Sequence, residues 1–445
     1  MLSRIGDNPC GKLSAVFHDA KELDGAYDFV ENENLSIARL ESAVGRATAR
    51  RKHGSHVFVA IDGSSLTLTA RPSGEDKGFG PIGPIQKGWK GLKVMTALSV
   101  GEDGAPIGVL AQSWWARPNV PGRPLKQCKK ERMKKTPREK ETRHWLEVIE
   151  RSAERLDEAG VCGWFQLDRE GDAWSTLLTL AEQGHRFTVR SSWDRLLDEP
   201  GPRRRYLRAT LAKTKPIGRY ELLISERWGR KARRAQMVVH AAEVTLLLRE
   251  KMNGKKPRPL RVRVVWTHEV GTVPRGEKPL NWMLLTNAAV DSFGAARRVV
   301  DGYAMRWRIE EFHRTWKTGA CDVERTQLRS RNAVIRWAMT LGVAAVRIER
   351  LKRLAREQPG EPASIELSAV EIEVLVALRK IHKRRREPDP DAMPTIGQAT
   401  LWIAELGGYT GQSSGGLPGS ITIGRGFERL RHGADAILAL RGRME

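Results

Sequence analysis

The chain has 445 residues, of which 40% are hydrophobic and 29% charged, and this composition excludes a disordered tail or a collagen-like rod. Its 77 lysines and arginines outnumber its 53 aspartates and glutamates and leave a formal charge of +24. This surplus favours an anionic partner, most commonly the phosphate backbone of nucleic acid, over a basic surface without a binding role.

No apolar run in the sequence approaches the roughly 20 residues that a membrane helix requires. Residues 1–17 also lack the continuous apolar segment of a secretory signal. We therefore expect a soluble, cytoplasmic protein without a membrane partner. The cysteines are scattered without the spacing of a zinc site or a disulfide framework, and we interpret them as core or bystander thiols.

The first elements change from helical to extended patterns. Apolar residues at three-to-four spacing predict helices over 21–31 and 36–51. Residues 57–61 form a nearly continuous apolar run, which predicts a buried central strand that closes in a turn at Asp62. Because further strands are predicted, we expect a mixed sheet; these strands cover 66–70, 91–100 and 107–114.

A second apolar strand over 162–167 also ends in an acid, Asp168, and it follows a predicted helix over 142–159. Alternating β-type segments run from 194 to 277, and we interpret them as an inserted β subdomain. The remaining predicted elements are a helix near 173–183, a strand over 186–190, a return to the main sheet at 281–285, a long helix over 292–318, further helix over 334–354, a linker near 383–390 and a final helical segment.

Asp62 and Asp168 are unusual because a carboxylate beside an apolar sheet must be compensated by a cation or a metal. Two Mg²⁺ ions held by carboxylates can clamp the attacking and leaving oxygens of a phosphodiester. The alternative is that each aspartate caps a helix or stabilises a turn, since aspartate is favoured at both positions.

The predicted helix over 292–318 supplies a third acid. At 100° per residue, a polar stripe about 60° wide comprises Tyr303, Arg306, Glu310 and Lys317. Glu310 is thereby placed to join the two aspartates, and Arg306 and Lys317 could contact phosphates. The alternative is a solvated helix face with pairs of charges four residues apart.

The spacing Tyr303-x2-Arg306-x3-Glu310-x6-Lys317 resembles the YREK signature of the insertion-sequence-four family of bacterial DDE transposases. The similarity extends to the segments 113–118, 168–172 and 281–286, and Asp62 matches the first catalytic acid of the family. The resemblance implies an α/β fold with an RNase-H-like catalytic core, namely a mixed five-stranded sheet flanked by helices. It also implies an inserted β subdomain and helical N- and C-terminal regions.

The resemblance implies five regions, which are a shortened helical DNA-end-binding region (1–55), the first part of the catalytic core (56–193), the inserted β subdomain (194–280), the second part of the core with the third acid (281–325) and a helical dimerisation region (326–445). The family carries an N-terminal helical domain that reads the transposon end, and here only about 55 residues precede the first catalytic strand. Either end recognition is rebuilt from other elements or the chain is truncated.

The resemblance implies a cut-and-paste transposase that nicks DNA, forms hairpins and transfers strands at transposon ends. Asp62, Asp168 and Glu310 would bind two Mg²⁺ ions, for which Mn²⁺ can substitute. The residues implied to contact DNA are Tyr303, Arg306, Lys317, Trp282, Arg190, Arg314 and Trp307. Among these, Trp282 matches the residue that receives a base flipped out of the stack.

The implied partners are the double-stranded DNA of transposon ends, target DNA and a second copy of the chain in a paired-end complex. The implied location is the nucleoid of the bacterial cytoplasm. The alternative function is a catalytically silent, N-terminally shortened DNA-binding regulator or inhibitor with the same fold. A basic RNA-binding or structural protein, with the acids as turn caps, is a second alternative.

Overall fold

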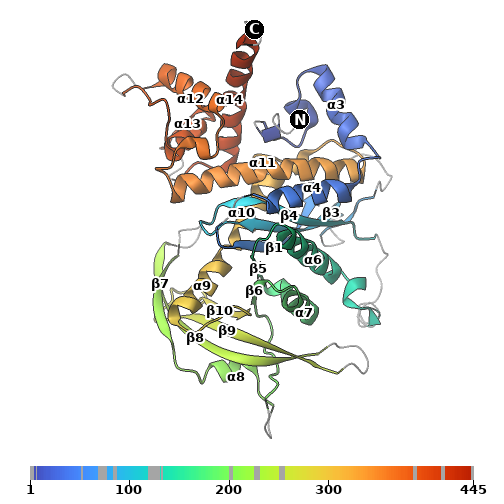
Figure 1. Ribbon diagram of the computed structural model, residues 1–445, viewed down its shortest axis with the longest axis vertical. Helices are drawn as coiled ribbons and strands as arrows, with labels where there is room; N and C mark the ends of the chain where they lie inside the picture. The colour runs from blue at the N-terminus through green and yellow to red at the C-terminus, as the bar shows by residue number, and fades with distance from the viewer. Residues whose placement is uncertain are drawn as a thin grey trace.

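The computed structural model describes residues 5–441 apart from 7, 52–53, 69–77, 84–87, 119–130, 132–133, 200–203, 225–230, 250–255, 384–387 and 412–415. Helix α11 crosses the molecule between the terminal helices and a large sheet (Figure 1). Parts of the predicted linker near 383–390 lie outside the described residues. No helix in the described part of the chain is long and apolar enough to cross a membrane.

The strands that the structure describes form one ten-stranded mixed sheet in the order β2-β3-β1-β5-β6-β10-β9-β8-β7, and β4 pairs with β3. Strands β1, β5 and β6 are parallel to one another, whereas the other pairs are antiparallel. The bounds are β1 Val57–Thr67, β2 Gly80–Pro81, β3 Lys90–Val100, β4 Pro106–Trp115, β5 Gly163–Leu167, β6 Arg186–Arg190, β7 Gly218–Ile224, β8 Arg233–Leu248, β9 Arg258–Val270 and β10 Asn281–Thr286.

Strand β1 corrects the prediction of a turn at Asp62. The strand continues to Thr67, with Asp62 opposite Thr96 and Leu66 opposite Leu92 of β3. Asp-Gly is a common turn signal, but pairing along β3 supplies hydrogen bonds that hold this segment extended. Asp62 therefore lies inside a strand, and the strand predicted at 66–70 is the end of β1 together with residues outside the described part.

Strands β7, β8 and β9, which the sequence predicts as an inserted subdomain, extend the main sheet. Strand β9 pairs with β10, and β10 pairs with β6, so the hydrogen-bonded ladder is continuous from β6 into these strands. The strands β4, β3, β1, β5 and β6 lie side by side in that order at the other end of the sheet. In Figure 1 the long strands β8 and β9 reach far beyond the shorter core strands.

Helices cover both faces of the sheet because the strand residues alternate between two apolar clusters. In β1, Val59 and Ile61 pack with α6 and α7, whereas Phe58 and Ala60 pack on the side of α9, α10 and α11. The bounds are α2 Leu13–Val16, α3 Ala20–Glu31, α4 Ile37–Ala49, α6 Thr142–Glu158, α7 Trp174–Glu182, α8 Leu207–Leu211, α9 Phe293–Ala304, α10 Trp307–Lys317, α11 Arg331–Glu357, α12 Ala369–His382, α13 Ile396–Leu406 and α14 Ser420–Arg441.

The single helix predicted over 292–318 is two helices, α9 and α10. At their junction the amide of Arg306 donates to the carbonyl oxygen of Tyr303, and the amide of Ile309 donates to that of Arg306, both at 3.1 Å. Such i to i−3 bonds tighten the turn to about 120° per residue. The polar stripe is therefore divided at Arg306, and only its C-terminal part follows the geometry of one α-helix.

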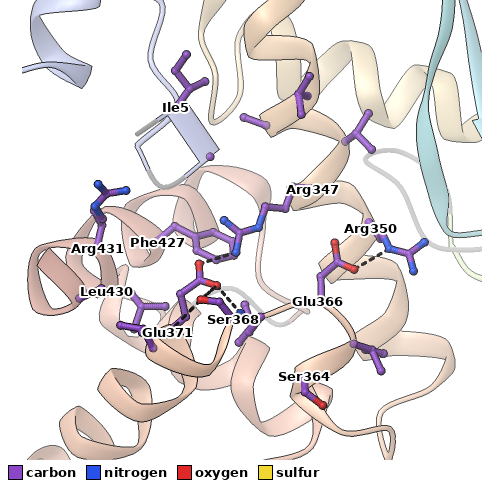
Figure 2. A pocket seen from close by; sticks show the side chains of 18 of the residues that line it. Ile5, Arg347, Arg350, Ser364, Glu366, Ser368, Glu371, Phe427, Leu430 and Arg431 are labelled. Carbon is purple, nitrogen blue, oxygen red and sulfur yellow. Dashed lines mark hydrogen bonds and ion pairs between the residues drawn. The ribbon is translucent and has the colours of Figure 1, made fainter. Parts of the chain in front are cut away.

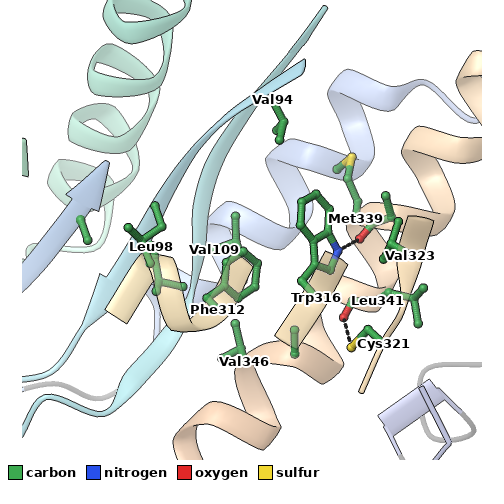
Figure 3. Packing of buried hydrophobic residues seen from close by; sticks show 14 of the residues in the cluster. Val94, Leu98, Val109, Phe312, Trp316, Cys321, Val323, Met339, Leu341 and Val346 are labelled. Carbon is green, nitrogen blue, oxygen red and sulfur yellow. Dashed lines mark hydrogen bonds between the residues drawn. The ribbon is translucent and has the colours of Figure 1, made fainter. Parts of the chain in front are cut away.

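Helix α10 is held in place by a buried aromatic pair. The Trp316 ring stacks on Phe312 with centroids 5.8 Å apart, and its Nε1 donates to the carbonyl oxygen of Ala338 on α11 at 2.7 Å (Figure 3). Both side chains are fully buried. Because protein interiors are close-packed, this contact determines where the other face of α10 lies against β1.

The N-terminal helices pack onto α11. The guanidinium of Arg336 donates to the carbonyl oxygens of Val30 and Leu35 at 2.7 and 2.9 Å. The indole of Trp337 donates to the carbonyl oxygen of Gly11 at 2.9 Å. These bonds satisfy backbone groups of the N-terminal segment that would otherwise be buried without partners.

Candidate catalytic site

Two neighbouring parallel strands place Asp62 and Asp168 side by side. Ile61 of β1 pairs with Leu167 of β5, so the residue after each occupies the same edge of the sheet, about 4.8 Å apart across the strands. Ile61 and Leu167 point into the cluster beneath α6 and α7. Because side chains alternate along strands, the two aspartates face the opposite side, where α9 and α10 lie.

Arg306 joins the first aspartate to the glutamate of α10. Its Nη2 lies 2.6 Å from Glu310 Oε1, and its Nη1 lies 3.4 Å from Asp62 Oδ2. The side chain of Arg306 is buried, and its Nε has no hydrogen-bond partner among the described residues. The structure thus brings the predicted acids of β1 and α10 together around one guanidinium.

Burial raises the pKa of Asp62 to about 7. Arg306 opposes this rise in pKa, whereas the carboxylates of Asp168 and Glu310 add to it. The amide of Gly63, which donates to Asp62 Oδ1 at 2.8 Å, also opposes the rise. The carboxylates of Asp168 and Glu310 therefore both lie close enough to act on Asp62, as a shared site requires.

Asp168 also serves as a cap. Its Oδ1 accepts a hydrogen bond from the amide of Glu170 at 2.8 Å, at the start of the short 3₁₀ turn Arg169–Gly171. The capping role considered from the sequence is therefore real. It leaves the other carboxylate oxygen available, so one side chain can both stabilise the turn and face the site.

The donor chemistry of the three acids fits a hard divalent cation. Carboxylate oxygens are the ligands that Mg²⁺ prefers, and a bound cation would favour the ionised form of Asp62, whose pKa is raised to about 7 in its absence. Within the part of the chain that the structure describes, no cluster of His, Cys, Asp or Glu is assembled as a metal site. The Arg306 guanidinium instead supplies the positive charge between Asp62 and Glu310.

Three predicted DNA contacts gather beside the acids. The rings of Trp282 and Tyr303 meet edge to face with centroids 5.9 Å apart. The Tyr303 hydroxyl bonds to Arg190, and burial raises the pKa of Tyr303. Arg190 also donates to the carbonyl oxygen of Asn281 at 3.0 Å. Tyr303 itself is buried, so Trp282 and Arg190 are the more accessible members of this group.

The other predicted DNA contacts lie along α10. Lys317 Nζ is 3.6 Å from Glu324 Oε1, and Glu324 also accepts the amide hydrogen of Thr67 at 2.9 Å. Arg314 is exposed. Trp307 is 42% exposed, and the guanidinium of the preceding Arg306 lies 5.5 Å from its ring centroid. These side chains extend the basic surface along the helix, away from Glu310.

Sequence reasoning did not single out Asp172 or Trp193, which lie close to the second acid. Asp172 belongs to the segment 168–172 that resembles the family, so its place in that motif was the signal available in the sequence. No sequence signal distinguishes Trp193 from the other tryptophans.

A cavity of about 890 Å³ lies apart from these groups, between α11, the C-terminal helices and the N-terminal segment. Four of its charged residues form two ion pairs: Arg347 lies 2.5 Å from Glu371, and Arg350 lies 2.7 Å from Glu366 (Figure 2). None of the predicted site residues lines this cavity. We therefore interpret its charges as links between helices.

Residues 126–347 match the family model of the transposase DDE domain. The matched segment includes Asp168 and Glu310, and it begins after β1 and Asp62. The mixed sheet flanked by helices is consistent with such a domain. The match supports an enzyme that acts on DNA. It also supports a more specific family, the DDE transposases.

Proposed function

We propose that the protein is a cut-and-paste transposase of the insertion-sequence-four family, similar to the transposon-five transposase. The observation that carries this proposal is the convergence of Asp62, Asp168 and Glu310 from β1, the end of β5 and α10. The strand order β4-β3-β1-β5-β6 supports an RNase-H-like core, with β7 to β9 as its insertion. The chain would act as a dimer on paired transposon ends, through its C-terminal helices.

Asp62, Asp168 and Glu310 would hold two Mg²⁺ or Mn²⁺ ions. When bound, such ions activate water or a 3′-hydroxyl and stabilise the charge that develops at the phosphorus. Arg306 neutralises part of the carboxylate charge in this structure. Its planar guanidinium also matches a phosphate in shape, so we expect it to contact the DNA backbone.

The aromatic group beside the acids suits DNA that has been unstacked. Trp282 is half-buried, with Tyr303 against its ring, so its position is well defined. Such a ring can receive an extrahelical base, which hairpin formation at a transposon end requires. Tyr303 orients Arg190 through its hydroxyl, and Arg190 would then contact a phosphate.

The basic residues of α10 would continue this contact along the backbone. Lys317 lies seven residues after Glu310, a distance of about 10 Å along a helix. Arg314 and Trp307 are the exposed members of the same helix. Lys317 and Arg314 would bind phosphates next to the cleaved position without reading the sequence, and Trp307 would contact a base.

The proposal is tested by incubating the purified protein with linear DNA that carries the ends of its own flanking element, in Mg²⁺ and in EDTA. Products are resolved on a denaturing gel. We expect nicks and hairpins at the element boundary only when metal is present. Binding without cleavage in Mg²⁺ would instead indicate a DNA-binding regulator.

A matched pair of variants assigns the cleavage to the site. Asp168→Asn should abolish cleavage, while DNA binding survives or strengthens because a carboxylate close to phosphate has lost its charge. Asp157→Asn makes the same change at an exposed position of α6, on the opposite face of the sheet, and should cleave like the wild type. Unchanged cleavage by Asp168→Asn would refute the site.

A further inference from the structure

Trp193 is unusually exposed for its size. It is 64% exposed and follows β6, which ends at Arg190. Tryptophan is highly buried on average, because its large ring is costly to hydrate. An exposed ring near a candidate site therefore calls for a functional explanation.

The backbone of Trp193 is held in place by the buried carboxylate of Asp172. Asp172 Oδ2 accepts hydrogen bonds from the amides of Ser192 and Trp193 at 2.6 and 3.3 Å, and from the Ser191 hydroxyl at 3.4 Å. Arg195 forms an ion pair with the other oxygen of the same group. A buried carboxylate must be bonded in this way. The ring is thus presented on a restrained backbone, so little conformational entropy is lost when it binds a partner.

The same loop is tied to the edge of the sheet that carries the acids. The Ser192 hydroxyl donates to the carbonyl oxygen of Arg169, the residue after Asp168, at 2.8 Å. The amide of Ser191 donates to the carbonyl oxygen of Met283, the residue after Trp282, at 2.7 Å. Trp193 therefore stands between the turn that follows the second acid and the start of β10.

We propose that Trp193 is a second aromatic contact for DNA, which stacks on a base unpaired next to the cleaved phosphodiester while Trp282 takes the extrahelical base. This inference rests on the proposed function. Two arginines flank the loop, with Arg169 exposed beside it and Arg190 at the end of β6, next to the exposed acids Glu170 and Asp194. Stacking on an aromatic ring combined with cationic contacts to phosphate is how proteins hold unpaired nucleic acid.

The test compares two forms of the element's end in EDTA, one fully paired and one with mismatched bases at the cleavage position. Fluorescence anisotropy at one salt concentration gives the Kd of each variant. Trp193→Ala should weaken binding to the mismatched end by about 5- to 150-fold and binding to the paired end by less. Trp193→Phe should retain most of the affinity, because it keeps an aromatic face.

A 2-aminopurine at the mismatch reports stacking directly. Its fluorescence should be quenched by the wild type and by Trp193→Phe, and less so by Trp193→Ala. Leu223→Ala removes another exposed side chain, 69% exposed on β7, and should change neither measurement. Equal affinities of Trp193→Ala and the wild type for both DNAs, or equal losses on both, would overturn the inference.

Measurements on the wild-type protein distinguish a failure of the proposed transposase function from a failure of the proposed role of Trp193. A wild-type protein that neither binds the end nor cleaves it in Mg²⁺ refutes the transposase function, and this inference with it. A wild-type protein that binds and cleaves, with a Trp193→Ala variant that discriminates the two DNAs as the wild type does, refutes only the role of Trp193.

Discussion

Arg306 and Glu310 form a charge-assisted hydrogen bond, with Nη2 and Oε1 2.6 Å apart, next to the aspartate of the central strand. The two residues are one helical turn apart, and Arg306 is the N-cap of α10. The same guanidinium that a phosphate would attract therefore serves as the counter-ion of the acids. In the metal-free protein the acids bind this guanidinium, and on DNA a phosphate would compete with them for it.

Arg306→Gln should make the stability of the folded protein depend more strongly on bound metal. Without the guanidinium, Asp62 and Glu310 lose the counter-ion that they share, so the free energy of unfolding in EDTA should fall by about 1.5–3 kcal/mol. Mg²⁺ should then raise the Tm of the variant by more than it raises that of the wild type. Arg308→Gln is the control, because Arg308 pairs with Glu311 at 2.7 Å on the same helix. Equal Tm values for Arg306→Gln and the wild type in EDTA would contradict this role.

The raised pKa of Asp62 predicts that the free energy of unfolding depends on pH in a specific way. Its pKa is raised to about 7 in the folded protein, from near 3.9 when unfolded, so the folded state binds more protons between these values. Its contribution to stability is complete below about pH 4 and is lost as the pH rises through 7. The free energy of unfolding of the wild type, minus that of Asp62→Asn, should therefore decrease from pH 4.5 to 8.

Urea unfolding in EDTA at a series of pH values measures this difference. Mg²⁺ should reduce the loss at high pH, because a cation favours the ionised carboxylate. A difference that stays constant over the whole range would show that the pKa of Asp62 is not raised in the folded protein.

A buried ion pair joins the N-terminal helices to the core. Arg155 Nη2 of α6 lies 2.6 Å from Glu41 Oε2 of α4, and both side chains are only 5% exposed. Glu41→Ala would leave Arg155 charged and unpaired, at a cost of about 3–5 kcal/mol of unfolding free energy. Chemical denaturation of Glu41→Ala, Arg155→Ala and the double variant checks this. The double variant should lose less than the sum of the single losses, whereas additive losses would show that the pair is not coupled.

Lys317→Ala should weaken binding to DNA of any sequence. If Lys317 neutralises one phosphate, the slope of log K against log salt should become shallower by about one unit. Titrations of one duplex at several salt concentrations, repeated with an unrelated duplex, measure this effect. Lys213→Ala, at an exposed position after α8, is the control. A slope equal to that of the wild type would remove Lys317 from the DNA contacts.

The sequence by itself predicted most elements and the order of the acids along the chain. The apolar run over 57–61 and the helical periodicity over 142–159 are local signals, and β1 and α6 confirm them. The position of Asp168 after an apolar strand was also readable, since strand ends follow hydrophobic patterns. These features depend on residues that are neighbours in the sequence, so they can be predicted without knowledge of the fold.

The tertiary structure decided how those elements meet. Pairing with β3 carries β1 past Asp62, where the local Asp-Gly signal predicts a turn, and β10 joins the inserted strands to the main sheet. The i to i−3 bonds at Arg306 divide a helix that periodicity alone makes continuous. Asp62, which pairs with Arg306, and the residues that bond to Asp172 lie on other segments of the chain. Hydrogen bonds and charges of this kind are satisfied only after distant segments have packed together, so no local pattern encodes them.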